Sequence, residues 1–177
     1  MPFKAKRDMI RLEMALMANL QAVLATDLPA VQQMYRLAFA DLYQRYHDDQ
    51  TDPYYETLAT LTWKWQQPDR HYYFYVVDQQ RVGMICVHDD SQQATTKRIS
   101  PLLILPSFQG NGYALTMLQA VQVQYSGATC WQVDTIAQES KLMQFYRRAG
   151  FQATSQHAEL QPGMTIVYFE KNRSEAG

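Results

Sequence analysis

Residues 104–114, ILPSFQGNGYA, place two glycines between an apolar run and a helical pattern. The first amides of a helix have no partner within the helix, and the helix dipole makes that end positive. Gly110 and Gly112 leave these amides open to an anion, because they carry no side chain. Tyr113 and Ala114 follow where a Walker loop needs Lys-Ser/Thr, and the third glycine of a dinucleotide fingerprint is missing. By itself, the GNG segment indicates only a turn or a helix start.

Two segments together are more specific than either alone. QGNGYA, which begins at Gln109, matches the Q/R-x-x-G-x-G/A loop of the GNAT superfamily of N-acetyltransferases, and Pro106 lies in its LILPSFQ lead-in. FYRRAGF, residues 145–151, resembles the F-Y-x-x-x-G-F block of the same family. The sequence therefore resembles a GNAT N-acetyltransferase over roughly residues 20–171.

The resemblance implies that acetyl-CoA is the cosubstrate and that loop amides hold its pyrophosphate. This family often carries Arg or Lys within the loop, whereas Gln109 and Asn111 stand here, so we expect anion binding to depend on backbone amides. The second block often opens with Asn, and Glu139 takes that place. The cofactor-binding residues that the resemblance implies are Leu103, Ile104, Leu105, Gln109, Gly110, Asn111, Gly112, Tyr113, Ala114, Glu139 and Tyr146.

Acetyl transfer to an amine needs a stabilised carbonyl oxygen, a neutral amine and a proton for the departing thiolate. The resemblance assigns the first task to a backbone N–H at a splayed strand end, near Ile104 or Leu105. We expect strand pairing to lapse at Pro106, which has no N–H to donate. Tyr146 matches the family tyrosine and is the candidate proton donor. The alternative is that Tyr146 is one more core aromatic in a chain with 12 tyrosines.

The general base has a less specific signal. Asp134 lies in the strand pattern CWQVDTI, residues 130–136, and is the catalytic candidate, although capping of the following turn explains it equally well. Glu139 begins the next helix, where complementing the helix dipole is the favoured interpretation. His88, beside Asp89, ends another strand and fits a loop histidine.

The acceptor pocket of this fold is usually closed by the first two helices and their connection, here DLYQRYHDDQTDPYYE. Tyr43 and Tyr46, one helical turn apart, and the carboxylates Asp48 and Asp52 are the candidate substrate-binding residues. Aromatic rings and carboxylates suit a cationic amine. The alternative is a solvated turn above packed tyrosines, and we favour it for Asp49.

The elements that must position these residues form one α/β domain. Hydrophobic patterns predict strands at 20–24, 71–78, 81–90, 98–105, 130–136, 151–160 and 164–171, and helices at 28–46, 53–65, 112–125 and 142–149. The resulting GNAT-like fold has a mixed central sheet of about seven strands flanked by about four helices, splayed at strands 4 and 5. Residues 1–19 are an N-terminal extension, either an extra helix or the result of a misplaced start. Residues 20–171 form the N-acetyltransferase domain and 172–177 a C-terminal tail.

Composition argues against several functions. The formal net charge of −1, without a stripe of Lys and Arg, argues against a nucleic-acid partner. No apolar run approaches the ~20 residues of a membrane span, and the N-terminus is too polar for a signal peptide. Cys86 and Cys130 lack CxxC spacing and a nearby His pair, so we expect free thiols, no metal site and a cytoplasmic location.

The sequence therefore predicts an acetyl-CoA-dependent N-acetyltransferase that acts on a primary amine of a small molecule, by direct attack in a ternary complex. A protein N-terminus or a lysine is left open as the acceptor, and so is a homodimer. The alternatives from other classes are a non-catalytic acyl-CoA-binding sensor and an interaction domain. The absence of a loop cation and of the family Asn leaves the sensor open, whereas the presence of Tyr146 argues against it.

Overall fold

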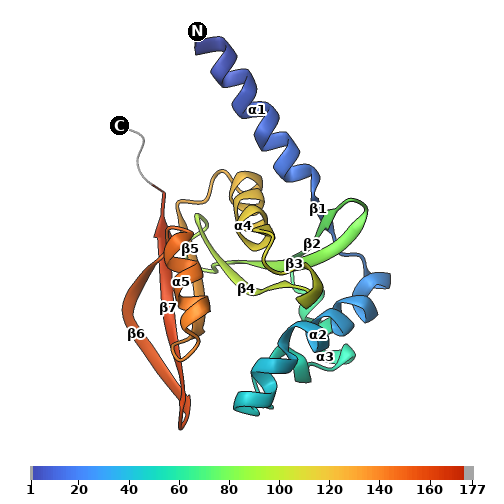
Figure 1. Cartoon of the computed structure of the whole chain (residues 1–177), viewed down its shortest axis with the longest axis vertical. Helices are drawn as coiled ribbons and strands as arrows, with labels where there is room; N and C mark the ends of the chain where they lie inside the picture. The colour runs from blue at the N-terminus through green and yellow to red at the C-terminus, as the bar shows by residue number, and fades with distance from the viewer. Residues whose placement is uncertain (1, 174–177) are drawn as a thin grey trace.

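The computed structural model describes residues 2–173, and the side chains of residues 4–173. Seven strands form one sheet in the order β1-β2-β3-β4-β5-β7-β6 (Figure 1). Neighbouring strands are antiparallel except β4 and β5, which run parallel, so the predicted mixed sheet is confirmed. The strands are β1 (Leu20–Ala22), β2 (Arg70–Val77), β3 (Gln80–Asp89), β4 (Thr96–Ile104), β5 (Cys130–Ile136), β6 (Gln152–Gln161) and β7 (Met164–Asn172).

Five α-helices lie within the described residues, one more than the four expected. The additional helix, α1, occupies most of the N-terminal extension and projects away from the domain (Figure 1). A predicted helix over 53–65 is instead a short 3-10 turn, η2 (Pro53–Tyr55), followed by α3, because the Thr57 side chain accepts the Thr60 N–H and starts a new helix there. The helices are α1 (Pro2–Ala18), α2 (Leu28–Tyr46), α3 (Leu58–Trp65), α4 (Tyr113–Gln124) and α5 (Ser140–Arg148).

The sheet has an apolar cluster on each face. One lies beneath α2 and α3, and the other lies beneath α4 and α5. Successive residues of β4 enter opposite clusters: Leu103 contacts the α2 side and Ile104 the α4 side. A strand buried on both faces reads as a continuous apolar run, which explains the LLIL pattern.

The parallel pairing of β4 with β5 is short. It runs from Thr96 opposite Cys130 to Ile99 opposite Val133 and then stops, although both strands continue. Pro101, which cannot donate a backbone hydrogen bond, lies just beyond the last pair. The prediction that pairing lapses at Pro106 is therefore wrong, because that residue lies past the strand, in the 3-10 turn η3 (Pro106–Phe108).

Beyond the lapse, each strand keeps its outer partner. β4 stays paired with β3 up to Ile104 opposite Gly83, while β5 stays paired with β7 up to Ile136 opposite Ile166. The sheet thus divides into a β1–β4 half and a β5–β7–β6 half. The splay predicted between the fourth and fifth strands is present.

Candidate active site

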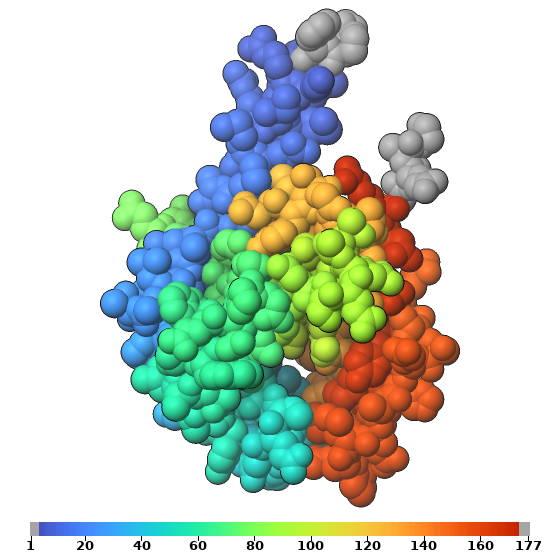
Figure 2. Space-filling view, turned by 180° about the vertical axis from the view of Figure 1, so that it is seen from behind, coloured from blue at the N-terminus to red at the C-terminus, as the bar shows by residue number. Residues whose placement is uncertain are grey.

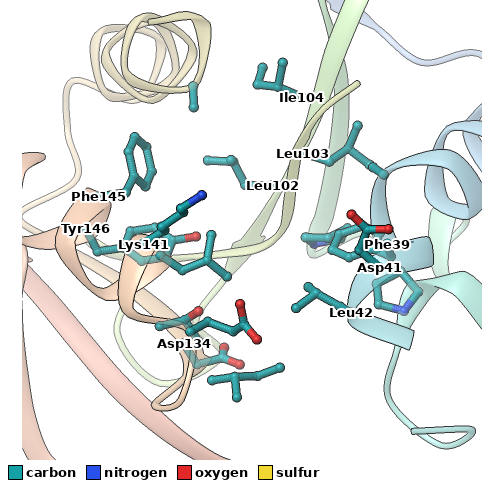
Figure 3. Close-up of a pocket in the computed structure, with 18 of the residues that line it drawn as sticks. Phe39, Asp41, Leu42, Leu102, Leu103, Ile104, Asp134, Lys141, Phe145 and Tyr146 are labelled. Carbon is teal, nitrogen blue, oxygen red and sulfur yellow. The ribbon is translucent and has the colours of Figure 1, made fainter. Parts of the chain in front are cut away.

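A cavity of about 1060 Å³ lies in the gap between the two halves of the sheet. Its walls are α2 and the segment leading to η2 on one side, and β5, α5 and β7 on the other. In Figure 3, Phe39, Asp41 and Leu42 approach it from α2, while Phe145 and Tyr146 approach from α5. The space-filling view shows a hollow between the segment coloured for residues 40–55 and the β6–β7 hairpin (Figure 2).

The GNG loop forms one end of this cavity. Gly110 and Gly112 have φ angles of +82° and +75°, a region that favours glycine, and a Cβ on either would meet no atom within 4 Å. Among residues 2–173, the N–H groups of Gly110, Gly112 and Tyr113 donate no hydrogen bond to a backbone carbonyl. The loop thus presents backbone donors to open space.

The polar side chains of the loop bind its own backbone. Gln109 Nε2 donates to the Ile104 carbonyl at 3.0 Å, and Asn111 Nδ2 donates to the Phe108 carbonyl at 3.0 Å. These side chains therefore brace the turn after β4. These contacts explain why Gln109 and Asn111 can occupy a loop in which the family often has a cation.

The strand exit separates the two expected oxyanion donors. The Leu105 N–H already donates to the Val82 carbonyl on β3 at 2.9 Å. Successive amides of a strand point to opposite edges, so the Ile104 N–H faces the gap left by β5. Leu103 and Ile104 both line the cavity. The geometry favours Ile104 over Leu105.

Tyr146 is both a core residue and a cavity residue. It is 8% exposed, and its ring meets those of Phe145, Phe151 and Phe169 with centroids 5.1 to 6.0 Å apart. Burial raises the pKa of Tyr146 well above its usual value, and the negative charge of Asp134 raises it further. The hydroxyl therefore keeps its proton at neutral pH, as a donor must.

Asp134 lies near the end of β5, in the cavity wall, with its side chain 23% exposed. Its Oδ1 accepts a hydrogen bond from Arg98 Nη2 on β4 at 2.6 Å. Among the described residues, Arg98 is the hydrogen-bond partner of the Asp134 carboxylate. Asp134 therefore does not cap the turn after β5. The structural alternative offered by the sequence thus gives way to an ion pair.

Glu139 is held by α2. Its two carboxylate oxygens accept hydrogen bonds from Arg45 at 3.1 and 3.0 Å, and Oε1 also accepts from the Tyr46 hydroxyl at 2.7 Å. Glu139 lies in the cavity wall, but its carboxylate is engaged by the acceptor-side helix instead of being free for a cofactor. The resemblance alone placed it with the cofactor.

The prediction that Tyr43 and Tyr46 look into the same space is wrong. Tyr43 stacks on Tyr54, with ring centroids 4.6 Å apart, and donates to Asp49 at 2.7 Å. Tyr46 packs against an apolar cluster from β5 and β7. Neither lines the cavity, because the cavity face of α2 follows a different helical stripe, Ala38, Asp41, Leu42 and Arg45, with Phe39 beside it. That stripe has i, i+3, i+4, i+7 spacing and was visible in the sequence.

Asp48 and Asp52 do line the cavity, and both also shape the loop. Asp48 Oδ1 accepts the N–H groups of Gln50 and Thr51, each at 3.0 Å, and Asp52 Oδ1 accepts that of Tyr54 at 2.9 Å. Burial raises the pKa of Asp52 most, its backbone bond opposes this, and the charge of Asp48 raises it further. These carboxylates are thus placed to meet a ligand and are structurally occupied.

His88 stays outside the site. Its Nε2 contacts the Ser100 carbonyl at 2.7 Å, and burial lowers its pKa, so the ring is neutral over a wide pH range. It is absent from the cavity wall, but it lies within β3 and is not the loop histidine that the sequence suggested.

The family of this chain follows from a match to a known protein family. Residues 30–151, more than half of the chain, match the acetyltransferase (GNAT) family. The chain belongs to that family. Among curated proteins, no sequence matches this GNAT chain significantly.

Solved structures with this fold include several acetyltransferases. The ribosomal-protein-S18-alanine N-acetyltransferase of Escherichia coli is 13% identical, with a TM-score of 0.69 over 89% of this chain and 95% of that one. A spermidine N-acetyltransferase chimera from Vibrio cholerae is 14% identical, with a TM-score of 0.67 over 88% and 96%. The PaiA N-acetyltransferase of Thermoplasma acidophilum, solved with coenzyme A, is 16% identical, with a TM-score of 0.67 over 87% and 98%. At these identities the likeness shows the fold.

The GNG loop of this GNAT chain carries no cation, but helix α5 brings two cations to the same cavity. Lys141 and Arg148, seven residues apart on α5, line the same cavity as the GNG loop. With Phe145 between them they follow i, i+4, i+7 spacing, so both lie on one face of the helix. Sequence reasoning missed them because it looked for positive charge within the loop.

Residues 2–173 contain neither a membrane-spanning helix nor a cluster of metal ligands. No helix there is long and apolar enough to cross a membrane, and no group of three or more His, Cys, Asp or Glu side chains is placed to hold a metal ion. Cys86 and Cys130 are free cysteines.

Proposed function

We propose that this protein transfers the acetyl group of acetyl-CoA to a primary amine of a small molecule, with both bound at once in the splay cavity. One observation carries the proposal. A single cavity joins open backbone donors at the GNG loop, the buried Tyr146 hydroxyl and a carboxylate-bearing face of α2. These are the parts that direct acetyl transfer between two bound molecules needs.

The GNG end fits acetyl-CoA, which supplies an activated acetyl thioester when bound. The N–H groups of Gly110, Gly112 and Tyr113 bind pyrophosphate oxygens, and the N-terminus of α4 adds its dipole. Lys141 and Arg148 supply the positive charge that the loop lacks. The fit therefore rests on backbone donors and on α5.

The chemical roles fall to two groups. The Ile104 N–H faces the gap and hydrogen-bonds the thioester carbonyl oxygen as negative charge develops there. The Tyr146 hydroxyl, which keeps its proton, hydrogen-bonds the departing sulfur and is replenished through solvent. Asp134, paired with Arg98, lies close enough to influence Tyr146 and orients the attacking amine or accepts its proton.

The acceptor lies against α2. Asp41, Asp48 and Asp52 bring carboxylates to that wall, which suits an ammonium group on the acceptor while a second, neutral amine attacks. The similar folds include enzymes named for spermidine and for a protein alanine, so both small and polypeptide amines are known on this scaffold. The carboxylates favour the small cationic molecule.

The remaining assignments follow from this one. We assign residues 20–171 to the transferase domain, 1–19 to an extension and 172–177 to a tail. The free cysteines suit a reducing, cytoplasmic setting.

A ligand-induced thermal shift combined with thiol release tests the function. Acetyl-CoA at 100 times its dissociation constant should stabilise the fold by about 2.7 kcal/mol, and an amine should then release free thiol. Stabilisation without turnover on small amines, protein N-termini and lysine would favour the acyl-CoA sensor. No shift with acetyl-CoA or with free CoA would favour the interaction domain.

A further inference from the structure

The two walls of the acceptor opening are joined by side chains at the end of α2. Glu139 lies between β5 and α5, whereas Arg45 and Tyr46 end α2 on the other half of the sheet. Three hydrogen bonds connect them, two from the Arg45 guanidinium and one from the Tyr46 hydroxyl. We call this contact, Arg45–Glu139–Tyr46, the acceptor bridge.

Further contacts fasten the same helix end to the β6–β7 hairpin. Gln161 Nε2, at the end of β6, donates to the Tyr46 backbone carbonyl. The Tyr46 ring packs with Ile136, Met164 and Ile166 from β5 and β7. A half-exposed ion pair alone would open readily, but here opening also exposes apolar side chains and breaks a partly buried phenol–carboxylate bond.

The bridge is part of the cavity wall, since Arg45 and Glu139 both line it. In the space-filling view, the hollow is bounded by the segment coloured for residues 40–55 where it meets the β6–β7 hairpin (Figure 2). These contacts therefore close the cavity along the edge between α2 and the hairpin. A short amine can reach the cavity with that edge closed, whereas a polypeptide lying between α2 and the hairpin would need the edge open.

We propose that the acceptor bridge is a specificity determinant, which restricts the acceptor to short free amines by joining α2 to the β5–α5 and β6–β7 segments. This inference rests on the proposed function, because it names the substrate class of the same site. It also assigns Glu139 to the acceptor side. A polypeptide chain extends by roughly 3.5 Å per residue beyond its reacting N-terminus, so the bridge blocks any path that runs between α2 and the hairpin.

The test compares two acceptors in two proteins. The open variant carries Arg45→Ala and Glu139→Ala, and Glu139 makes no side-chain cap to α5 that would be lost. The matched control, Arg81→Ala with Asp27→Ala, removes another ion pair, of 2.9 Å, which is absent from the cavity wall. We expect the ratio of kcat/KM for a pentapeptide amine to that for 1,4-diaminobutane to rise by about tenfold or more in the open variant, and to stay unchanged in the control.

Two results would overturn the proposal. One is an unchanged ratio in the open variant. The other is a loss of acetyl-CoA affinity of about tenfold or more by calorimetry, which would return Glu139 to the cofactor side. The expected change in that affinity is less than about twofold.

Hydrogen exchange separates this proposal from the proposed function, because it needs no turnover. The bridge should protect the amides of residues 43–47, so these should exchange at least about tenfold faster in the open variant, while residues 30–36 exchange as before. Unchanged exchange at 43–47 would overturn the bridge even in a protein that transfers no acetyl group. Faster exchange together with absent turnover would instead contradict the proposed function and leave the bridge standing.

Discussion

Arg98 donates a hydrogen bond to Asp134 at 2.6 Å, beside the last paired residues of β4 and β5. The pair thus lies where the sheet divides and where the cavity begins. It fixes the position of one carboxylate oxygen next to the buried Tyr146, whose pKa responds to it.

Asp134 should matter for catalysis because of this position. We predict that Asp134→Asn lowers kcat for the amine by about tenfold or more, since the variant can neither accept a proton nor hold the guanidinium as firmly. Steady-state thiol release measures this. Glu170→Gln, on neighbouring β7 and outside the cavity wall, should keep full activity. Full activity in the Asn variant would remove Asp134 from the reaction.

Tyr146→Phe should lower kcat by roughly 10² or more and leave KM for acetyl-CoA nearly unchanged, because the lost hydrogen bond acts on the departing sulfur. Burial raises the pKa of Tyr146, so the hydroxyl keeps its proton at neutral and mildly alkaline pH. Loss of this proton should therefore not lower kcat on the alkaline side of the pH profile, below the raised pKa of Tyr146. Tyr35→Phe, in the buried cluster under α2 and α3, is the matched control. Wild-type turnover in Tyr146→Phe would assign the residue to the core alone.

The GNG loop should respond to the backbone more than to polar side chains. Gly112 has φ +75°, so Gly112→Val is strained by about 1–2 kcal/mol and should weaken acetyl-CoA binding by about tenfold or more. Asn111→Ala loses only the brace to the Phe108 carbonyl and should cost roughly threefold. Calorimetric titration compares them. Equal losses in both variants would contradict a site made of backbone donors.

The cations of α5 should contribute to cofactor affinity. We predict that Arg148→Gln weakens CoA binding by about fivefold and reduces its dependence on salt, because a phosphate contact is lost. Arg147→Gln is the control, since Arg148 lines the cavity and Arg147 does not. Similar losses in the two variants would mean that only the general charge of α5 matters.

The acid limb of amine binding should depend on Asp52. Its raised pKa means that Asp52 takes up a proton at higher pH than a free carboxyl, so the charge that attracts an ammonium is lost first as pH falls. We predict that kcat/KM for a diamine declines toward acid pH and that Asp52→Asn flattens this decline while raising KM. A pH profile of both proteins provides the measurement. An unaltered acid limb in the variant would place the titrating group elsewhere.

Much of the fold was predictable because it depends on local patterns. The strand at 130–136 and the helix start beside Gly112 agree with the structure, since alternation and glycine positions mark them directly. The site was less predictable. Spacing of i, i+3 places Tyr43 and Tyr46 near one another on α2, but which face of a helix meets a cavity is set by packing with distant strands.

Contacts between distant segments account for the other differences. Glu139 and Arg45 are 94 residues apart, and nothing in either local pattern indicates their ion pair. The lapse of pairing was assigned to Pro106 because that residue precedes the loop motif, whereas parallel pairing ends after Ile99, near Pro101. Register between parallel strands is a tertiary property, which the motif does not encode.

The central claim is that one cavity brings acetyl-CoA and a small amine together for direct transfer. Thiol release from acetyl-CoA, measured with and without 1,4-diaminobutane and combined with mass spectrometry of the amine, tests it most directly. We predict thiol release that depends on the amine and equals the acetylated amine formed. Tight acetyl-CoA binding with no amine-dependent thiol release, from any small amine or peptide, would contradict it.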